Sequence, residues 1–322
     1  MTQVKKTIPI ILMFNDSYAL PAGVAICSLL SNANKNYNYN IHILHEDITK
    51  RNIFILTDIV SRFSNSRIFF KDMGNVFTKE WDMIKTKQYY SKECLYKLLL
   101  PQLFKNYDRV VVTDVDVVFR GDISPSIDLI DDRYYIMGYR PPYKLLQIYD
   151  NYTNTNKTIR RKLKEGIGAG FMVYNLSLMR QDNVQEKLLE SLSRHISLLI
   201  QPEQDIINIV LYKRIGYLPL EYCFCTYMYN LFRKEDELNT EVSGHTIDYL
   251  LKKYKNNLQN DKNYSKEELL RAFDSPVQIH FANGIKPWLK TFTKRKSDWL
   301  YYLLKTPYRT RYFLGIFYNL LK

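Results

Sequence analysis

The first half of the chain alternates short apolar stretches with longer stretches of helical character. Residues 8–14, 40–45 and 67–71 are brief apolar or β-branched runs that predict buried strands. Residues 19–31, 49–63 and 93–104 are longer and predict helices, the last with Leu95, Leu98, Leu99 and Leu103 on one face. Strands that alternate with helices predict an α/β fold with a mainly parallel sheet and helices on both faces.

The second half is less regular. Residues 166–175 predict a glycine-rich turn that leads into a strand, and residues 183–200 predict a helix. Residues 217–274 are rich in Tyr, Asn and Lys, show no repeat and predict irregular loops. We therefore expect one domain over residues 1–290, followed by a distinct tail over residues 291–322.

That tail is basic and aromatic. From Lys286 onward the chain has nine Lys or Arg and one Asp, so this stretch has a net charge of +8 out of +13 for the whole chain. A solvated basic face is the simplest interpretation of such a run. Basic residues mixed with aromatic rings also suit an anionic membrane surface, which is the partner we expect here. The rings are Trp299, Tyr301, Tyr302, Tyr308, Tyr312, Phe313, Phe317 and Tyr318.

Cysteine usage and hydropathy predict a cytoplasmic protein. The four cysteines are scattered, and the one close pair, Cys223 and Cys225, lacks the spacing of a redox or zinc pair. The apolar run near the start is too short for a signal peptide, and no run reaches the ~18 residues of a membrane span. The tail could lie on a membrane without crossing it.

Two carboxylates follow the strand-like run at residues 110–112. Asp114 and Asp116 are two residues apart, so on a strand they point to the same face. They could hold one hard cation, Mn²⁺ or Mg²⁺, which would neutralise a diphosphate leaving group. A solvated acidic turn is the alternative. The carboxyl end of a strand in an open α/β sheet is where ligands bind, which favours the site.

His280 and Lys286 flank a turn near the end of the domain. His280 ends the short strand predicted at residues 277–279, and Lys286 follows six residues later. An imidazole on a cation with an ammonium on phosphate oxygens would suit a metal-bound diphosphate. A histidine satisfied within the core is the alternative.

Two further polar groups lie at the ends of predicted elements. Glu203, Gln204 and Asp205 begin an apolar helix, where they could cap its first turn or contact a sugar. Asn15 and Asp16 end the first strand, where they could cap the next helix or contact a nucleotide.

Other common chemistries lack their motifs. No Gly-x-Gly-x-x-Gly follows the first strand, and there is no P-loop and no Gly-x-Ser-x-Gly. The GIGAG segment at 166–170 precedes a strand rather than a helix, which is the wrong context for a phosphate cradle. Nucleic acid is not an expected partner, because the basic residues concentrate in the tail rather than along a groove.

Six motifs together resemble glycosyltransferase family 8, which includes lipopolysaccharide and lipooligosaccharide galactosyl- and glucosyltransferases. The resemblance covers roughly residues 8–290. In chain order the motifs are FNDSY, YKLLLP, VVTDVDVVF, GAGFMVYN, PEQDIIN and HFANGIKPW. Each is weak alone, and their order and spacing make the signal specific.

The resemblance implies a role for each matching residue. It implies a single nucleotide-diphospho-sugar transferase (GT-A type) domain, with UDP-galactose or UDP-glucose as donor. Asp114, Asp116 and His280 match Mn²⁺ ligands, and Lys286 matches a lysine on the diphosphate. Gln204 matches a glutamine beneath the anomeric carbon. The other matching positions are Asn15 and Asp16 (uracil and ribose), Lys97 (donor), Glu203 and Asp205 (sugar), and Val115, Gly168, Ala169 and Asn283 in the donor-binding motifs.

Three positions depart from the family pattern. Gly168 stands where the family often has Asn, which removes one sugar contact. Glu203 replaces a usual Asp, and Asn283 replaces a usual Gly, although Gly284 follows.

The resemblance also implies retention of anomeric configuration. Because an amide oxygen is a poor nucleophile, we favour front-face attack over a glycosyl intermediate, with Gln204 stabilising oxocarbenium charge. The acceptor we expect is lipopolysaccharide core or another lipid-linked glycan, on the inner face of the plasma membrane. The alternatives are a self-glucosylating, glycogenin-like priming protein and a non-catalytic basic binding protein.

Overall fold

The structure is a computed structural model that describes residues 5–85, 90–143, 146, 149–150, 155–231, 261–282, 284, 286–289 and 293–320. Asn283 lies outside these residues, as does much of the stretch expected to be irregular. The described residues form a seven-stranded sheet and a three-stranded sheet. The first contains β1 (Thr7–Met13), β2 (Asn38–His45), β3 (Ser66–Asp72), β4 (Arg109–Thr113), β6 (Ile136–Tyr139), β7 (Phe171–Asn175) and β8 (Ile215–Leu218). The second contains β5 (Val117–Phe119), β9 (Phe224–Cys225) and β10 (Gln278–His280).

The large sheet is mainly parallel, as predicted. Its strand order is β3-β2-β1-β4-β7-β6-β8. β3, β2, β1 and β4 run parallel to one another, and β6 runs parallel to β8. β7 is antiparallel to both of its neighbours, β4 and β6. The loops that follow β4 and precede β7 therefore meet at one edge of the sheet.

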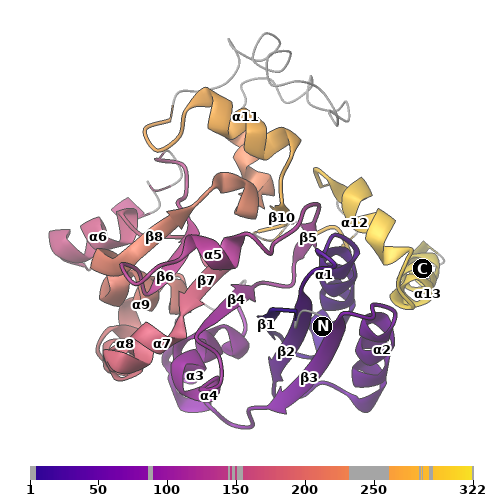
Figure 1. The fold of residues 1–322 in the computed structure, drawn as a ribbon, viewed down its shortest axis with the longest axis horizontal. Helices are drawn as coiled ribbons and strands as arrows, with labels where there is room; N and C mark the ends of the chain where they lie inside the picture. The colour runs from indigo at the N-terminus through magenta and orange to yellow at the C-terminus, as the bar shows by residue number, and fades with distance from the viewer. Residues whose placement is uncertain are drawn as a thin grey trace.

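Alternate residues of β1 enter two different cores. Ile10 and Leu12 belong to a core shared with α1 (Ala19–Ser31) and α2 (Lys50–Ser61). Ile11 belongs to a second core on the opposite face of the sheet. This alternation follows from the two-residue period of a strand, and it explains why β1 is apolar throughout. Figure 1 shows α1 and α2 together on one side of the strands.

Short helices cover the second face and the ends of the sheet (Figure 1). The α-helices are α3 (Thr78–Met83), α5 (Ser126–Leu129), α6 (Lys157–Lys164), α7 (Leu176–Gln181), α8 (Val184–His195) and α9 (Pro202–Leu211). The 3₁₀ segments are η1 (Asp16–Tyr18), η4 (Ile196–Leu198), η5 (Tyr212–Arg214), η6 (Leu220–Cys223) and η7 (Thr226–Leu231). The prediction of one helix over residues 183–200 thus holds for α8 with η4.

The regular helix predicted over residues 93–104 is wrong in type. A 3₁₀ helix, η2 (Lys92–Leu99), precedes a single α-turn, α4 (Leu100–Leu103). Pro101 lies in the first turn of α4, and because proline has no N–H it cannot continue a preceding helical hydrogen-bond ladder. Eight residues are long for a 3₁₀ helix, because runs of more than three or four residues are uncommon. Lys97 lies on this segment.

A helix lies within the stretch that was expected to be irregular. α11 (Lys266–Asp274) is capped by Ser265, whose side chain accepts a hydrogen bond from the Glu268 backbone N–H, while the Glu268 side chain accepts one from the Ser265 N–H. This reciprocal capping box is visible in the sequence as Ser-x-x-Glu before an apolar run. The irregular loops expected over residues 217–274 are therefore wrong for residues 266–274.

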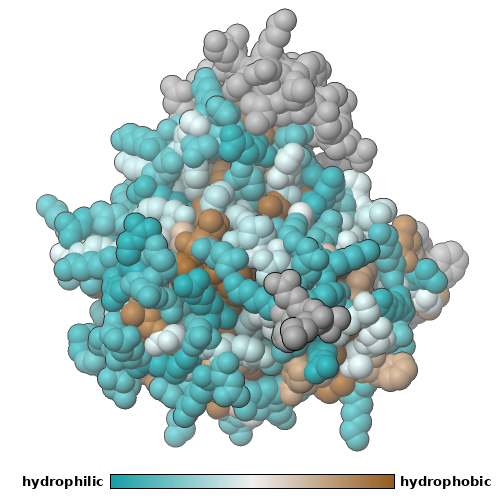
Figure 2. All heavy atoms as spheres, in the orientation of Figure 1, coloured by the Kyte–Doolittle hydropathy of each residue, from teal (hydrophilic) through white to brown (hydrophobic). Residues whose placement is uncertain are grey.

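The distinct tail expected after residue 290 is not confirmed. α12 (Lys296–Leu303) and α13 (Tyr308–Leu320) lie beside α1, and Trp299, Tyr302, Tyr308 and Tyr312 are buried in the core that contains α1. Over residues 296–315, the large apolar side chains that are exposed are Tyr301, Leu304, Phe313 and Leu314. In Figure 2 some of the apolar surface on this face lies over α12 and α2. Among the described residues, no helix is long and apolar enough to span a membrane.

Candidate functional site

The Asp-x-Asp motif lies between a strand of the large sheet and a strand of the small one. β4 ends at Thr113, and β5 begins at Val117. Val115 is buried in the core, which anchors the segment between its two carboxylates. The Asp114 backbone N–H donates a hydrogen bond to the Gly170 carbonyl (3.2 Å), so the glycine-rich turn before β7 lies against the motif.

The small sheet brings His280 to these carboxylates from more than 160 positions further along the chain. His280 ends β10 and is paired with Val117 of β5. Its Nε2 lies 3.1 Å from Asp116 Oδ1 and 3.7 Å from Asp114 Oδ2. The three side chains predicted as metal ligands therefore converge, with one donor atom from each within 4.8 Å of the others.

Lys286 binds one of these two carboxylates, Asp116. Its Nζ lies 2.5 Å from Asp116 Oδ2 and donates to the Phe281 carbonyl at 2.7 Å. The Phe281 N–H in turn donates to the Asp116 carbonyl (2.9 Å). Burial acts to raise the pKa of Asp116, but the positive charges and hydrogen bonds of His280 and Lys286 outweigh it, so the pKa lies below its usual value. Asp116 is thus held ionised.

Lys97 joins the metal motif to Glu203. Its Nζ donates to Asp114 Oδ1 (2.8 Å), Glu203 Oε1 (2.9 Å) and the Ala169 carbonyl (3.2 Å), and the residue is only 3% exposed. Burial acts to lower the pKa of Lys97, but the two carboxylates raise it well above its usual value. Burial acts to raise the pKa of Glu203, but the charge and hydrogen bond of Lys97 outweigh it, so this pKa lies below its usual value. The lysine expected to contact the donor therefore lies beneath the site as a buried cation.

Gln204 is held between the glycine-rich turn and two polar side chains. Its Oε1 accepts a hydrogen bond from the Ala169 backbone N–H (2.9 Å). Its Nε2 donates to the Tyr149 hydroxyl (3.1 Å) and to Gln201 Oε1. The amide group is thereby fixed in one orientation next to the turn that contacts Asp114.

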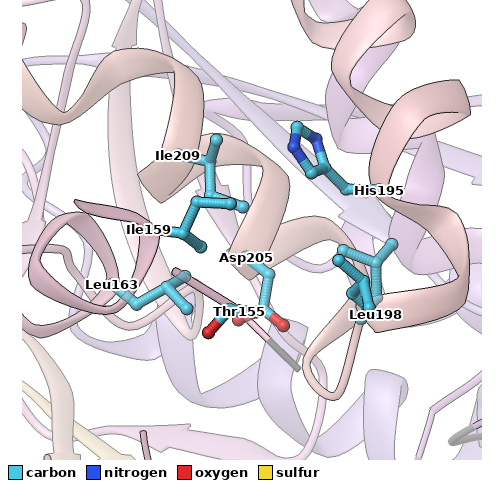
Figure 3. A pocket seen from close by; sticks show the side chains of 8 residues that line it. Thr155, Ile159, Leu163, His195, Leu198, Asp205 and Ile209 are labelled. Atoms are coloured by element: carbon cyan, nitrogen blue, oxygen red, sulfur yellow. The ribbon is translucent and has the colours of Figure 1, made fainter. Parts of the chain in front are cut away.

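Asp205 is directed away from this cluster, although its two neighbours belong to it. Its Oδ2 accepts hydrogen bonds from the backbone N–H groups of Ile200 and Gln201 (both 3.0 Å), which ties down the entry to α9. Figure 3 shows Asp205 at a small, mainly apolar cavity between α6, α8 and α9. The residues that line this cavity are Thr155, Ile159, Leu163, His195, Leu198, Leu199, Asp205 and Ile209. The described hydrogen bonds of Asp205 therefore support the alternative that this residue caps the first turn of α9.

Asp16 connects the end of β1 to the start of α2. Its Oδ1 accepts hydrogen bonds from the Thr49 N–H (2.8 Å), the Thr49 hydroxyl (2.9 Å) and Asn52 Nδ2 (2.7 Å). Asn15 Oδ1 accepts from the Ser17 hydroxyl (2.6 Å). These contacts hold the loop after β1 in place, at the carboxyl edge of the sheet where the nucleotide contact was expected.

Tyr139 fills the space beside Gly168. A Cβ atom on Gly168 would lie 2.2–2.4 Å from three atoms of the Tyr139 ring and hydroxyl. The Tyr139 hydroxyl is 3.0 Å from the Tyr227 hydroxyl and 3.4 Å from Cys225 Sγ. The asparagine that the family often has at this position would not fit, and a phenol hydroxyl occupies that region instead.

The cluster has neighbours that were not among the predicted site residues. Tyr18 packs edge-on against Trp288, with ring centroids 5.7 Å apart. Burial raises the pKa of the Tyr18 hydroxyl above its usual value, and the nearby charge of Lys286 offsets only part of that rise. Tyr139 and Gly170 also contact predicted site residues. Tyr18 was visible in the FNDSY motif. The contacts of Tyr139 with Gly168 and of Gly170 with His280 join positions far apart in the chain, and no local sequence pattern predicts them.

The ligand set suits a hard or borderline divalent cation. Two carboxylates and one imidazole are ligands typical of Mn²⁺, and the carboxylates also suit Mg²⁺. A lysine beside such a group can bind phosphate oxygens. The arrangement can therefore hold a metal-bound diphosphate at the carboxyl edge of an open sheet.

Comparison with known families agrees with this geometry. Residues 9–291 match the model of glycosyl transferase family 8. The chain belongs to that family. It is therefore a glycosyltransferase. A Haemophilus influenzae (strain Rd) protein named "Putative glycosyltransferase" is 23% identical over 233 residues, which cover 72% of this chain and 68% of that protein.

Solved structures share the fold at low identity. The WbbM bifunctional glycosyltransferase in its apo form has a TM-score of 0.71 and 23% identity, and the match covers 97% of this chain. This chain spans about half (52%) of WbbM. The galactosyltransferase LgtC, in complex with donor and acceptor sugar analogues, has a TM-score of 0.66 and 16% identity over 93% of this chain and 96% of LgtC. The family 8 chain thus has a GT-A-like domain.

Proposed function

We propose that this family 8 chain transfers galactose or glucose from a UDP-sugar to a glycan acceptor, with retention of anomeric configuration and dependence on Mn²⁺ or Mg²⁺. The observation that carries the proposal is the convergence of Asp114, Asp116 and His280 next to Lys286. A bound divalent cation would neutralise charge on the departing UDP. LgtC, a galactosyltransferase of the same fold, supports the choice of hexose.

Lys286 is the residue that would act directly on the diphosphate. Its ammonium group now neutralises Asp116. When a cation occupies the carboxylates, Lys286 can donate to phosphate oxygens instead and stabilise the negative charge that develops there.

Lys97 would act as a positioning residue. Because it is buried between Asp114 and Glu203, it fixes the orientation of one metal-binding carboxylate. The same lysine binds the carbonyl of Ala169, whose N–H holds Gln204. The metal motif and the glutamine are therefore joined through one turn of backbone.

Gln204 would stabilise positive charge on the sugar rather than attack it. Its amide oxygen is a weak nucleophile, and the Ala169 N–H occupies one of its lone pairs. Front-face attack on the donor is therefore favoured over a glycosyl-enzyme intermediate. Full kcat in Gln204→Ala would remove Gln204 from this mechanism.

The test is UDP release from a panel of UDP-sugars, with and without Mn²⁺. We expect slow hydrolysis of one UDP-hexose that requires metal, is lost in Asp116→Ala and persists in Asp58→Ala, whose carboxylate forms an exposed pair with Arg62. If the enzyme releases no UDP without its acceptor, Mn²⁺-dependent binding of UDP, measured by calorimetry, is the readout instead. The absence of both turnover and metal-dependent UDP binding would contradict the proposal.

We also propose a lipid-linked acceptor and a peripheral position on the cytoplasmic face of the plasma membrane. The support is the exposed apolar group on α12 and α13, which includes Phe313 and Leu314, together with the exposed bases Lys305, Arg309 and Arg311. Binding to anionic vesicles should fall in Phe313→Ser/Leu314→Ser and not in Leu129→Ser, which changes an exposed leucine on α5. Equal binding by both variants would contradict the proposal.

A further inference from the structure

Two buried thiols lie behind the imidazole of His280. Cys223 ends η6, Cys225 lies in β9, and His280 is paired with Cys225 across the β9–β10 ladder. Cys223 Sγ is 3.7 Å from His280 Nδ1, and Cys225 Sγ is 3.6 Å from the same atom. Both cysteines are 0% exposed. The pair has the wrong sequence spacing for a zinc motif, but the fold supplies a third ligand from 55 residues away.

The two nitrogens of His280 face ligand sets of different chemistry. Nε2 faces the oxygens of Asp116 and Asp114. Nδ1 faces the sulfurs of Cys223 and Cys225. Carboxylate oxygens suit Mn²⁺ and Mg²⁺, whereas thiolates with an imidazole suit Zn²⁺ and similar soft ions.

The separations between sulfur and nitrogen match those of a tetrahedral zinc site. Bonds of about 2.3 Å to sulfur and about 2.0 Å to nitrogen, at a tetrahedral angle, place the two donor atoms about 3.6 Å apart. The observed distances are 3.6 and 3.7 Å, and the three donor atoms all lie within 4.8 Å of one another. The Tyr139 hydroxyl, 3.4 Å from Cys225 Sγ, offers a fourth polar atom on the same side.

Asp116 completes this arrangement as the partner of the histidine. A histidine that binds zinc through one nitrogen commonly donates its other N–H to a carboxylate, which fixes the ring and strengthens the ligand. Asp116 Oδ1, 3.1 Å from Nε2, is placed to accept that hydrogen bond. The carboxylate that serves the oxygen site is thus also the orienting group for the sulfur site.

We propose that Cys223 Sγ, Cys225 Sγ and His280 Nδ1 form a second metal site, selective for thiophilic divalent ions of the Zn²⁺ and Cd²⁺ class. On binding, each thiol gives its proton to solvent and each sulfur donates an electron pair to the ion, with no change of oxidation state. The site does not depend on the proposed transferase activity.

The two sites should oppose each other because they share one imidazole. A filled sulfur site should therefore weaken Mn²⁺ binding by about tenfold, and by linkage Mn²⁺ should weaken Cd²⁺ binding by the same factor.

The experiment is a titration of the chelator-treated full chain with Cd²⁺, followed by the ultraviolet thiolate-to-cadmium charge-transfer band. We expect a band that saturates at one ion per chain, is lost in Cys223→Ser/Cys225→Ser, and persists in Cys27→Ser, which removes another buried free thiol. Oxygen ligands give no such band, so the Asp114–Asp116 site cannot imitate it. No band in the wild type, or a band that survives in the double variant, would overturn the proposal.

If the double variant does not fold, X-ray absorption at the cadmium edge tests the proposal on the wild-type protein alone. The spectrum of the wild-type complex should show two sulfur neighbours and one nitrogen neighbour. A shell of oxygen and nitrogen alone would overturn the proposal.

Discussion

A Cβ atom on Gly170 would lie 2.4 Å from Nδ1 and 2.6 Å from Cε1 of His280. The His280 ring therefore occupies space that only glycine leaves open. Gly170→Ala should displace the imidazole from its present position between Gly170 and Asp116 and weaken Mn²⁺ binding by about 10- to 100-fold, the usual cost of disturbing the groups that orient a metal ligand. Electron paramagnetic resonance of free Mn²⁺ measures this. Gly315→Ala, where the added Cβ meets nothing within 4 Å, is the control, and equal affinity in both variants would contradict the prediction.

The contact between Gly168 and Tyr139 predicts a coupled pair of substitutions. Gly168→Ala should lower the free energy of unfolding by about 1–3 kcal/mol, because the new methyl group overlaps a buried ring. In Tyr139→Val the ring is absent, so adding Gly168→Ala should cost much less. Urea unfolding of the two single variants and the double variant measures the coupling. If the changes in free energy of unfolding simply add in the double variant, the two positions are not coupled and the prediction is contradicted.

His42 predicts one window of acid destabilisation. Burial lowers the pKa of His42 to about 4, and its ring stacks on Phe69 with centroids 4.9 Å apart. Below pH ~6.5 the imidazole gains a proton in the unfolded chain but not in the folded one, so stability falls between pH ~6.5 and pH 4. Since the ring is partly exposed, we expect a loss of about 1–2 kcal/mol.

The control for this window is His42→Gln, which cannot titrate there. Urea unfolding at pH 7 and pH 4.5 should show a smaller loss of stability in His42→Gln than in the wild type. Equal losses would assign the acid sensitivity to other groups.

Local pattern was sufficient to predict much of the first half of the fold. β1 and α1 lie within a residue of the predicted ranges, because continuous apolar runs and a polar start to the helix are local signals. The type of the segment at 92–103 was wrong because Pro101 interrupts the ladder of hydrogen bonds. Trp299 and Tyr312 were expected at a membrane, whereas they pack in the core with α1. The composition of the segment shows that aromatic side chains are present, but it does not show which distant part of the fold they pack against.

The candidate site divides in the same way. Asp114, Asp116, His280 and Lys286 could be predicted because each lies in a recognisable motif, and the structure brings them together. The depth of Lys97 could not be predicted, since it depends on Glu203, 106 positions away. The spacing of Cys223 and Cys225 does not by itself indicate a metal site, because only the pairing of β9 with β10 brings His280 next to them.

Burial of Lys97 between two carboxylates predicts a large structural cost for its removal. Lys97→Met leaves Glu203 as a buried negative charge, and Asp114 as a partly buried one, without their cation, which should lower the free energy of unfolding by about 3–5 kcal/mol. Adding Glu203→Gln to Lys97→Met removes one of those charges and should recover part of the loss. The matched control is Lys164→Met, whose ion pair with Asp150 is exposed and should be worth less than about 1 kcal/mol. Urea unfolding of the three variants measures these free energies. If Lys97→Met lowers the free energy of unfolding no more than Lys164→Met does, the prediction is contradicted. The two carboxylates would then take up protons or water in the variant instead of remaining charged and without a partner.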